Sequence, residues 1–337
     1  MLRFSGWRLL AGVTIPMAAG SGVSAQQAPP INIIVGFGAG GLYHNTGVLL
    51  SRHMGKYLPG NPTIIVRTMP GAGAIIAANH IAHVAPKDGT VLGIVGGATI
   101  LEPLFDNKQA QYDPRTLRWI GSMSTAVNLC TVWGETKVRT LEDMKTVELV
   151  AGSTGRGSRT YDYPTALNTL LGTKFKVISG YTGLTQLHPA MERGEVQAIC
   201  GWGWDGIMAQ RPDWLRDKKI NILVQMAYQK HPNLPDVPLI LDLMKNEKER
   251  QAMRLLVLDT LVAWPLIAAA GTADAKIAEL RQAFNRAMED PAMIEETKKS
   301  ARSWDYVTGE RIEKAIADVY ASPPDVVALA RGLLDHK

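Results

Sequence analysis

Residues 31–41 read INIIVGFGAGG, a short β-branched run followed at once by a glycine-rich turn. A helical pattern extends over 45–57, and the sequence PGNP at 59–62 ends it. The same order of elements then returns in four segments: a strand over 63–66, the turn PGAG at 70–73, a helix over 74–84 and a strand over 90–95. Strands that alternate with glycine turns and helices predict a mostly parallel sheet covered by helices.

A second unit of the same style follows residue 120. We expect its strands at 129–133, 147–151, 175–179, 196–200 and 221–226, and its helices at 164–171 and 184–193. The last third of the chain is helical in pattern, over 274–288, 292–301 and 309–320. The apolar segment 255–270, interrupted by Asp259 and Pro265, is expected to be buried strand and turn, with the chain returning through a strand at 261–270.

These elements predict an α/β protein of two lobes, each a mixed sheet flanked by helices. A length of 337 residues fits two domains. We assign 26–128 with 262–337 to the first domain and 129–261 to the second. Two crossings between the domains would permit hinge closure over a cleft.

Residues 1–25 are typical of a cleavable export signal: Arg3 and Arg8, an uncharged stretch at 9–19, and the small-x-small site Val23-Ser24-Ala25. That stretch is too short for a membrane span, which needs about 20 apolar residues. Cleavage would leave 312 residues and lower the net charge from +5 to +3. A balance this mild is not typical of a nucleic-acid-binding protein.

Composition sets further limits. A hydrophobic fraction of 46% and a charged fraction of 20% exclude wholesale disorder. The two cysteines, Cys130 and Cys200, allow either a disulfide or two buried thiols in an exported protein. Without a CxxC pair, neither a structural zinc site nor a redox motif is expected.

Gly36 to Gly41 match the G-x-G-x-x-G spacing of a dinucleotide site, after a strand and before a helix. The next strand, however, ends in Arg67-Thr68 rather than in an acid that would hold a ribose. A glycine turn at a helix N-terminus also presents unpaired N–H groups to an anion. Three turns have this form, at 38–44, 71–74 and 153–158, and the alternative is that they are only tight connections.

Catalytic patterns are missing from the sequence. There is no G-x-S-x-G elbow and no paired-carboxylate motif, so we predict no catalytic residue, cofactor or metal site. An exported α/β enzyme remains the alternative function. Trp202, Trp204 and Asp205 end a predicted strand among glycines, where they would contact a ligand or pack a hinge.

Five segments, in order, resemble those of the solute-binding proteins of tripartite tricarboxylate transporters, the Bug family. They are Gly40-Gly41-Leu42-Tyr43-His44, TMPGAG at 68–73, PKDGT at 86–90, GRGS at 155–158 and Tyr181-Thr182-Gly183. The resemblance implies a type II periplasmic binding protein of the Venus-flytrap form. It would be a monomer that passes a small carboxylate to a membrane permease, or that serves a sensor, and it would bind no nucleic acid.

The resemblance also carries over the positions that contact the ligand, to which the strand-end Asp205 is added: Phe37, Gly38, Ala39, Gly40, Gly41, Leu42, Tyr43, His44, Ala72, Gly73, Ser153, Thr154, Gly155, Arg156, Gly157, Ser158, Tyr181, Thr182 and Gly183. His44 stands where the family has an acid. Because histidine donates a hydrogen bond, and favours an anion when protonated, this departure suggests a ligand with two acidic or acceptor groups. A di- or tricarboxylate or an aromatic acid is therefore expected, rather than an amino acid.

Overall fold

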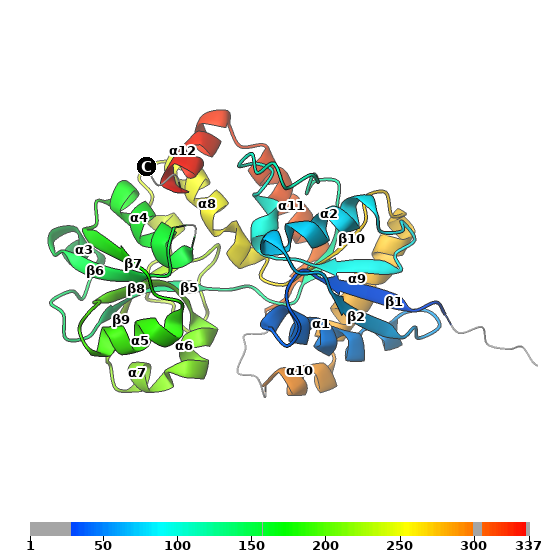
Figure 1. Cartoon of the computed structure of the whole chain (residues 1–337), viewed down its shortest axis with the longest axis horizontal. Helices are drawn as coiled ribbons and strands as arrows, with labels where there is room; N and C mark the ends of the chain where they lie inside the picture. Colours follow the sequence, from blue (N-terminus) through cyan, green and yellow to red (C-terminus); the bar gives the residue numbers. More distant parts are fainter. Residues whose placement is uncertain (1–27, 157, 299–304, 335–337) are drawn as a thin grey trace, which may run out of the picture.

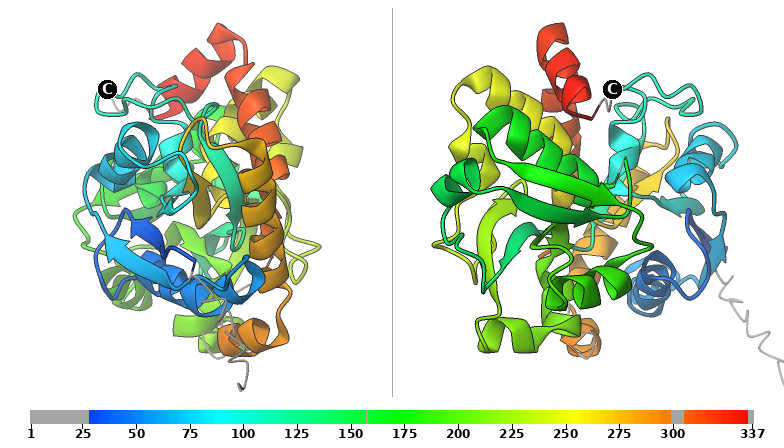
Figure 2. Two further views of the ribbon diagram at one scale, coloured as in Figure 1. Left: turned by 90° about the vertical axis from the view of Figure 1, so that its right-hand side faces the viewer. Right: turned by 60° about the vertical axis from the view of Figure 1, so that its left-hand side comes forward.

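The computed structural model describes residues 28–156, 158–298 and 305–334 and has two lobes side by side (Figure 1). The predicted export signal, 1–25, lies outside the described residues. Each lobe is built on one mixed sheet with helices on its faces (Figure 2). Among the described helices, none combines the length and the apolar character needed to cross a membrane.

The sheet of the first lobe has the strand order β11-β4-β10-β3-β1-β2. Its strands are β1 (Ile31–Val35), β2 (Ile64–Thr68), β3 (Val91–Ile94), β4 (Arg118–Ser122), β10 (Pro265–Ala268) and β11 (Val307–Thr308). The parallel pairing predicted for the first three strands is confirmed, because β1 runs parallel to both β2 and β3. β10 is antiparallel to β3 and β4, which makes the sheet mixed.

Helices cover both faces of this sheet. They are α1 (Leu42–His53), α2 (Ile75–His83), α9 (Asp274–Met288), α10 (Pro291–Lys298) and α11 (Gly309–Tyr320), with short 3₁₀ turns η1 (Gly55–Tyr57), η2 (Ala72–Ala74) and η3 (Gly97–Ile100). Alternate residues of β1 point to opposite faces. Ile33 therefore packs with α1 and α9, whereas Ile34 packs with α2. Gly36 is required after β1, since a Cβ there would lie 2.3 Å from the Cβ of Ala74.

The sheet of the second lobe has the order β7-β6-β8-β5-β9. Its strands are β5 (Asn128–Trp133), β6 (Leu149–Ser153), β7 (Phe175–Ser179), β8 (Ala198–Gly203) and β9 (Ile220–Met226). The helical elements are α3 (Leu141–Thr146), α4 (Arg159–Leu171), α5 (Leu184–Glu192), α6 (Trp204–Gln210), α7 (Pro212–Arg216) and η4 (Ile240–Leu243). Cys130 of β5 faces Cys200 of β8, and the structure joins them in a disulfide, which decides the alternative that the sequence left open.

Two helices link the lobes. In α8 (Glu247–Leu261), Met253 and Val257 belong to the core of the second lobe, whereas Leu255 and Leu258 belong to a core of the first. α12 (Pro324–Leu334) packs on α8 and α4 and places Leu333 in the second lobe's core (Figure 1). The C-terminal helix thus adds a contact between the lobes to the two predicted crossings. The division at 128/129 and 261/262 remains a proposal.

The prediction for 255–270 was wrong in its first half. Residues 255–261 are the last turns of α8, and the strand β10 occupies only four residues, Pro265–Ala268. The two sides of α8 are buried in different cores, so apolar residues lie on both sides of this segment and lack the periodicity of an amphipathic helix. Short apolar runs of this kind do not distinguish helix from strand.

Candidate functional site

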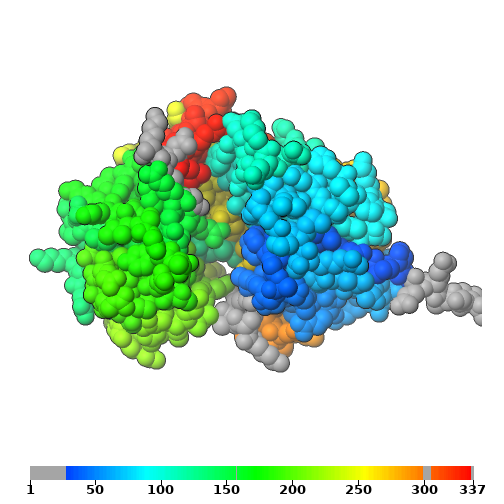
Figure 3. Space-filling model, in the orientation of Figure 1, coloured from blue at the N-terminus to red at the C-terminus, as the bar shows by residue number. Residues whose placement is uncertain are grey.

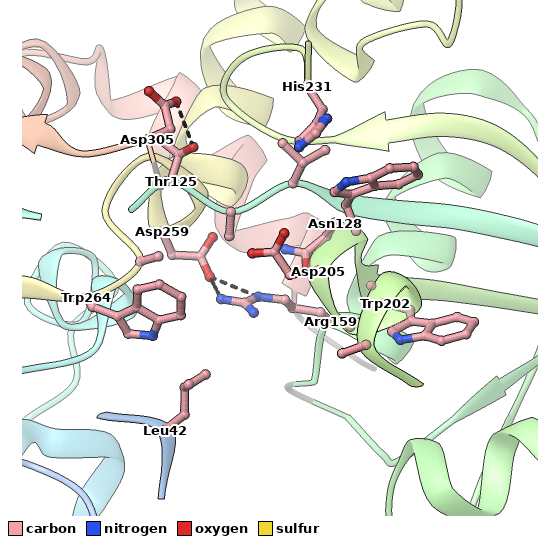
Figure 4. A pocket seen from close by; sticks show the side chains of 18 of the residues that line it. Leu42, Thr125, Asn128, Arg159, Trp202, Asp205, His231, Asp259, Trp264 and Asp305 are labelled. Carbon is pink, nitrogen blue, oxygen red and sulfur yellow. Dashed lines mark hydrogen bonds and ion pairs between the residues drawn. The ribbon is translucent and has the colours of Figure 1, made fainter. Parts of the chain in front are cut away.

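A cavity of about 710 Å³ lies in the groove between the lobes (Figures 3 and 4). Both crossings line it, through residues 125–128 and 263–264. The first lobe contributes Leu42 and Tyr43, the second contributes Arg159 and Asp205, and Asp259 comes from α8. Because the wall is divided between the lobes and the crossings, a movement of the lobes would change its shape.

Three helices begin at this wall: α1, α4 and α6, the last of which starts at Trp204. Leu42 and Tyr43 are the first residues of α1, and Arg159 is the first residue of α4. The preceding residues, Gly41 and Ser158, make no side-chain capping hydrogen bond. The N-termini of α1 and α4 therefore bring the positive ends of helix dipoles to the cavity, one from each lobe.

Arg159 and Asp259 form an ion pair in the wall (Figure 4). Arg159 Nε donates to Asp259 Oδ2 at 3.0 Å, and Nη2 donates to the same oxygen. The carboxylate raises the pKa of Arg159, so the guanidinium is always charged. The side chain of Arg159 is 46% exposed and that of Asp259 only 11%. Within the described ranges, Asp259 Oδ1 is buried and has no hydrogen-bond partner.

Tyr43 lies close to this ion pair. Burial is the main cause that raises the pKa of its hydroxyl, with smaller opposing effects from Arg159 and Asp259. The phenol therefore keeps its proton at neutral pH and can donate a hydrogen bond. The ring of Phe37 stacks on that of Tyr43, with centroids 3.9 Å apart and planes at 22°, and this contact restricts the orientation of the phenol.

Two further carboxylates of the wall, Asp205 and Asp305, lie close enough to His231 to act on its charge. Thr125 Oγ1 and Gln229 Nε2 both donate to Asp305 Oδ2, at 3.1 and 2.9 Å. Burial lowers the pKa of His231, and the nearby carboxylates of Asp205 and Asp305 oppose this only in part. The imidazole is therefore mostly neutral at pH 7.

The structure brings three of the predicted ligand-contacting residues into the wall: Leu42, Tyr43 and Asp205. Gly157 lies outside the described residues. The remaining predicted positions are not part of the wall in this conformation: Phe37, Gly38, Ala39, Gly40, Gly41, His44, Ala72, Gly73, Ser153, Thr154, Gly155, Arg156, Ser158, Tyr181, Thr182 and Gly183.

The loop at 153–158 uses its polar groups internally. Thr154 N donates to Thr160 Oγ1, and Gly155 N donates to Ser153 Oγ, both at 3.0 Å. Ser158 Oγ donates to the carbonyl oxygen of Gly155 at 2.6 Å. These groups were predicted to hold a ligand carboxylate, whereas here they fix the turn that precedes Arg159.

Sequence reasoning missed several residues of the wall. Arg159 directly follows a predicted anion loop, and Asp259 is a lone acid in an apolar run, so both carried a local signal. His231, Trp264 and Asp305 carried none, because each is remote in sequence from the predicted loops and reaches the cavity only through the tertiary fold.

Gly201 allows Arg159 its position. Its φ of +87° lies in the left-handed region, and an added Cβ would come within 2.8 Å of the Cβ of Arg159. The next residue, Trp202, is fully buried and lines the cavity. The glycine therefore lets the end of β8 approach the start of α4.

Comparison with known proteins places this geometry in context. The model of the tripartite tricarboxylate transporter family receptor (TctC) matches residues 50–324. A UPF0065 protein from the tcbD–tcbE intergenic region of Pseudomonas sp. strain P51 is 22% identical over 302 residues, covering 87% of this chain and 84% of that protein.

Two solved structures share the fold. A TctC solute-binding protein from Polaromonas superposes with a TM-score of 0.71 at 20% identity, covering 91% of this chain and 98% of that one. The R. palustris protein Rpa4515, solved with adipate, has a TM-score of 0.60 at 15% identity, with coverage of 91% and 98%. These likenesses confirm the predicted two-lobed fold of a periplasmic binding protein.

Proposed function

Because this chain belongs to the tripartite tricarboxylate transporter receptor family, we propose that it captures a small carboxylate in the cavity between its lobes. The family consists of extracytoplasmic solute-binding proteins and not of enzymes. The protein is exported by means of residues 1–25, acts as a monomer and delivers its ligand to the membrane subunits of a tripartite transporter.

The observation that carries the proposal is the position of the Arg159 guanidinium in the cavity wall. This group is half exposed in the cavity and stands at the N-terminus of α4, so the charge and the helix dipole act in the same direction. Among the hydrogen bonds of the described residues, Asp259 uses two of the guanidinium nitrogens, Nε and Nη2. The guanidinium fork keeps donors for a ligand carboxylate, a pairing of high strength and specificity.

The opposite lobe completes the carboxylate site. Tyr43 carries a protonated hydroxyl at the start of α1, and the uncapped N-terminus of that helix faces the same cavity. A carboxylate bound by Arg159 would attract this second dipole. Binding would thereby favour the closed arrangement of the lobes, the state that a permease can distinguish from the empty protein.

The class of carboxylate follows from the wall and from a relative. Trp204 and Trp264 give the wall broad aromatic surfaces, which suit an aromatic acid. The adipate found with Rpa4515 supports a linear dicarboxylate. We therefore include di- and tricarboxylates and aromatic acids among the candidate ligands.

The test is isothermal titration calorimetry with adipate, succinate, benzoate and 4-aminobenzoate on the mature protein and on Arg159→Met. We expect at least one of these acids to bind, and its affinity to fall 10- to 100-fold in Arg159→Met, since hydrogen bonds to a charged group are lost. Arg193→Met is the matched control, because Arg193 also pairs with a carboxylate in the second lobe but lies outside the cavity wall. Failure of all four acids to bind, or equal affinity in Arg159→Met, would contradict the proposal.

A further inference from the structure

The C-terminal helix α12 has side chains in the cores of both lobes. Val326 and Ala330 are buried in a core of the first lobe, whereas Leu333 is buried in the core of the second. The spacing of these residues places all three on one face of the helix. The same helix packs on α4 of the second lobe. It therefore crosses the boundary between the lobes and connects them beside the two crossings of the chain (Figure 1).

Polar contacts attach α12 to the first lobe. Arg331 Nη1 forms an ion pair with Asp106 Oδ2 at 2.8 Å, and Arg331 Nη2 donates to the carbonyl oxygen of Leu104 at 3.1 Å. Both partners belong to the loop that follows η3, and Leu104 packs against the same core as the first half of α12. The helix is thus held to the first lobe by Arg331 and to the second by Leu333, only two residues further along the chain.

α12 and the ligand cavity lie on opposite sides of the crossings. Figure 1 places α8 and α12 at the top of the molecule and α1 and α6 toward the bottom, with the crossing into β5 between them. Leu42 and Tyr43 at the start of α1, and Trp204 at the start of α6, belong to the cavity wall. A rotation of the lobes about the crossings that narrows the groove would therefore widen the side on which α12 connects them.

A second cavity, of about 260 Å³, lies where α12 begins. Gln251 and Arg254 of α8 line one side of it, and Ser322 and Pro323, in the turn between α11 and α12, line another. Protein interiors are otherwise close-packed, so a space of this size leaves the start of α12 without complete support from α8. The helix can therefore shift against α8 when the lobes move, while its far end stays attached to both lobes.

We infer that α12 is a strap that stabilises the open arrangement of the lobes and thereby lowers the affinity for the ligand. The inference rests on the proposed function, in which ligand binding favours closure of the groove. Contacts that are made in the open arrangement and loosened on closure shift the equilibrium toward the open state. The apparent affinity falls with the population of the state that binds, so a weaker strap should give tighter binding.

The experiment releases the strap at either end. Leu333→Ala weakens its attachment to the second lobe, and Arg331→Met removes its polar attachment to the first while leaving both cores intact. Leu149→Ala is the matched control for the first variant, because Leu149 is buried in the same core, at 3% exposed against 2%, but lies on β6. Arg193→Met, at an exposed ion pair of the second lobe, is the control for the second variant.

Two quantities are measured. Calorimetry at pH 7.5 gives the affinity of each protein for whichever of adipate, succinate, benzoate and 4-aminobenzoate binds the wild type most tightly. Small-angle X-ray scattering gives the radius of gyration of each protein without ligand, and that of the wild type saturated with the same acid.

We expect Leu333→Ala and Arg331→Met each to bind the acid about three- to tenfold more tightly than the wild type, although neither residue is in the cavity wall. Their radii of gyration without ligand should fall toward that of the saturated wild type. The two controls should bind no more tightly than the wild type. A merely structural role of α12 would have the opposite effect, because damage to the fold weakens binding.

Unchanged or weaker binding in Arg331→Met, or in a folded Leu333→Ala, overturns the inference, and so does equal tightening in Leu149→Ala. If Leu333→Ala does not fold, Arg331→Met decides alone. When an acid binds and depends on Arg159 but the strap variants do not bind it more tightly, the inference fails and the proposed function stands. When none of the four acids binds, the proposed function fails, and an unchanged radius of gyration in the strap variants overturns the inference separately.

Discussion

The Arg159–Asp259 ion pair connects α4 of the second lobe to α8, the helix whose side chains pack in both lobes. Arg159→Met removes the cation and leaves a carboxylate whose side chain is only 11% exposed. Asp259→Asn removes the negative charge and keeps the shape of the side chain. A double-mutant cycle with these two changes isolates the interaction of the pair.

The interaction energy of the Arg159–Asp259 pair can be calculated from its geometry. Unit charges 3.0 Å apart, the Nε–Oδ2 distance, attract by about 5.5 kcal/mol at an effective dielectric constant of 20 and by about 1.4 kcal/mol in water. Nearly half of the Arg159 side chain is exposed, so water screens the pair, and desolvation of Asp259 removes part of the gain. We expect a coupling of about 1–2 kcal/mol, with Arg159→Met alone costing about 2 kcal/mol because it leaves Asp259 unpaired.

The measurement is urea unfolding followed by tryptophan fluorescence, with the free energy of unfolding compared among the wild type, both single variants and the double variant. Arg159→Met should cost clearly less in the Asp259→Asn background than in the wild type. Arg193→Met, at an exposed pair, should change the free energy by less than about 0.5 kcal/mol. Additivity of the two changes within about 0.3 kcal/mol would refute the reasoning.

Three further predictions concern the surroundings of the cavity. Gly201→Ala should weaken carboxylate binding in calorimetry, because its Cβ would displace Arg159, and an unchanged affinity would contradict this. Burial, aided by Arg211, lowers the pKa of His188 in the folded protein below its ordinary 6.5, so the unfolded chain binds the proton more readily. The free energy of unfolding should therefore fall as the pH drops below 6.5, by at most about 1.4 kcal/mol per pH unit from this group. In His188→Phe the fall between pH 7 and pH 5.5, measured by urea unfolding, should be smaller. A fall of the same size in both proteins would exclude the effect. The disulfide Cys130–Cys200 spans 70 residues, so reduction should lower the melting temperature and cost up to about 4 kcal/mol, while a double alanine variant should not respond to reductant.

The local elements followed from the sequence with little ambiguity. Glycine turns and β-branched runs placed β1, β2 and β3 within two residues of their observed bounds, since these signals depend on neighbouring residues alone. The prediction for residues 255–261 was wrong because their structure depends on residues far away in the sequence. The apolar residues of this segment are buried by two different lobes, a property of the assembled fold that no short window contains.

The residues of the cavity wall also fall into those that local sequence signals predicted and those that they did not. Leu42 and Tyr43 were found because a glycine turn followed by a helix marks a helix N-terminus, and Asp205 because it ends a predicted strand. Asp305 and His231 could not be found, because only the packing of the lobes brings them to one cavity.

The sequence by itself determined the class of fold and the use of helix N-termini, because both rest on hydrogen bonding between residues close along the chain. Tertiary structure decided which groups reach the ligand. Arg159 meets Asp259 across 100 residues, and Asp305 meets Thr125 across 180. The charge balance of the cavity is a sum over such distant groups, and only their positions in space determine it.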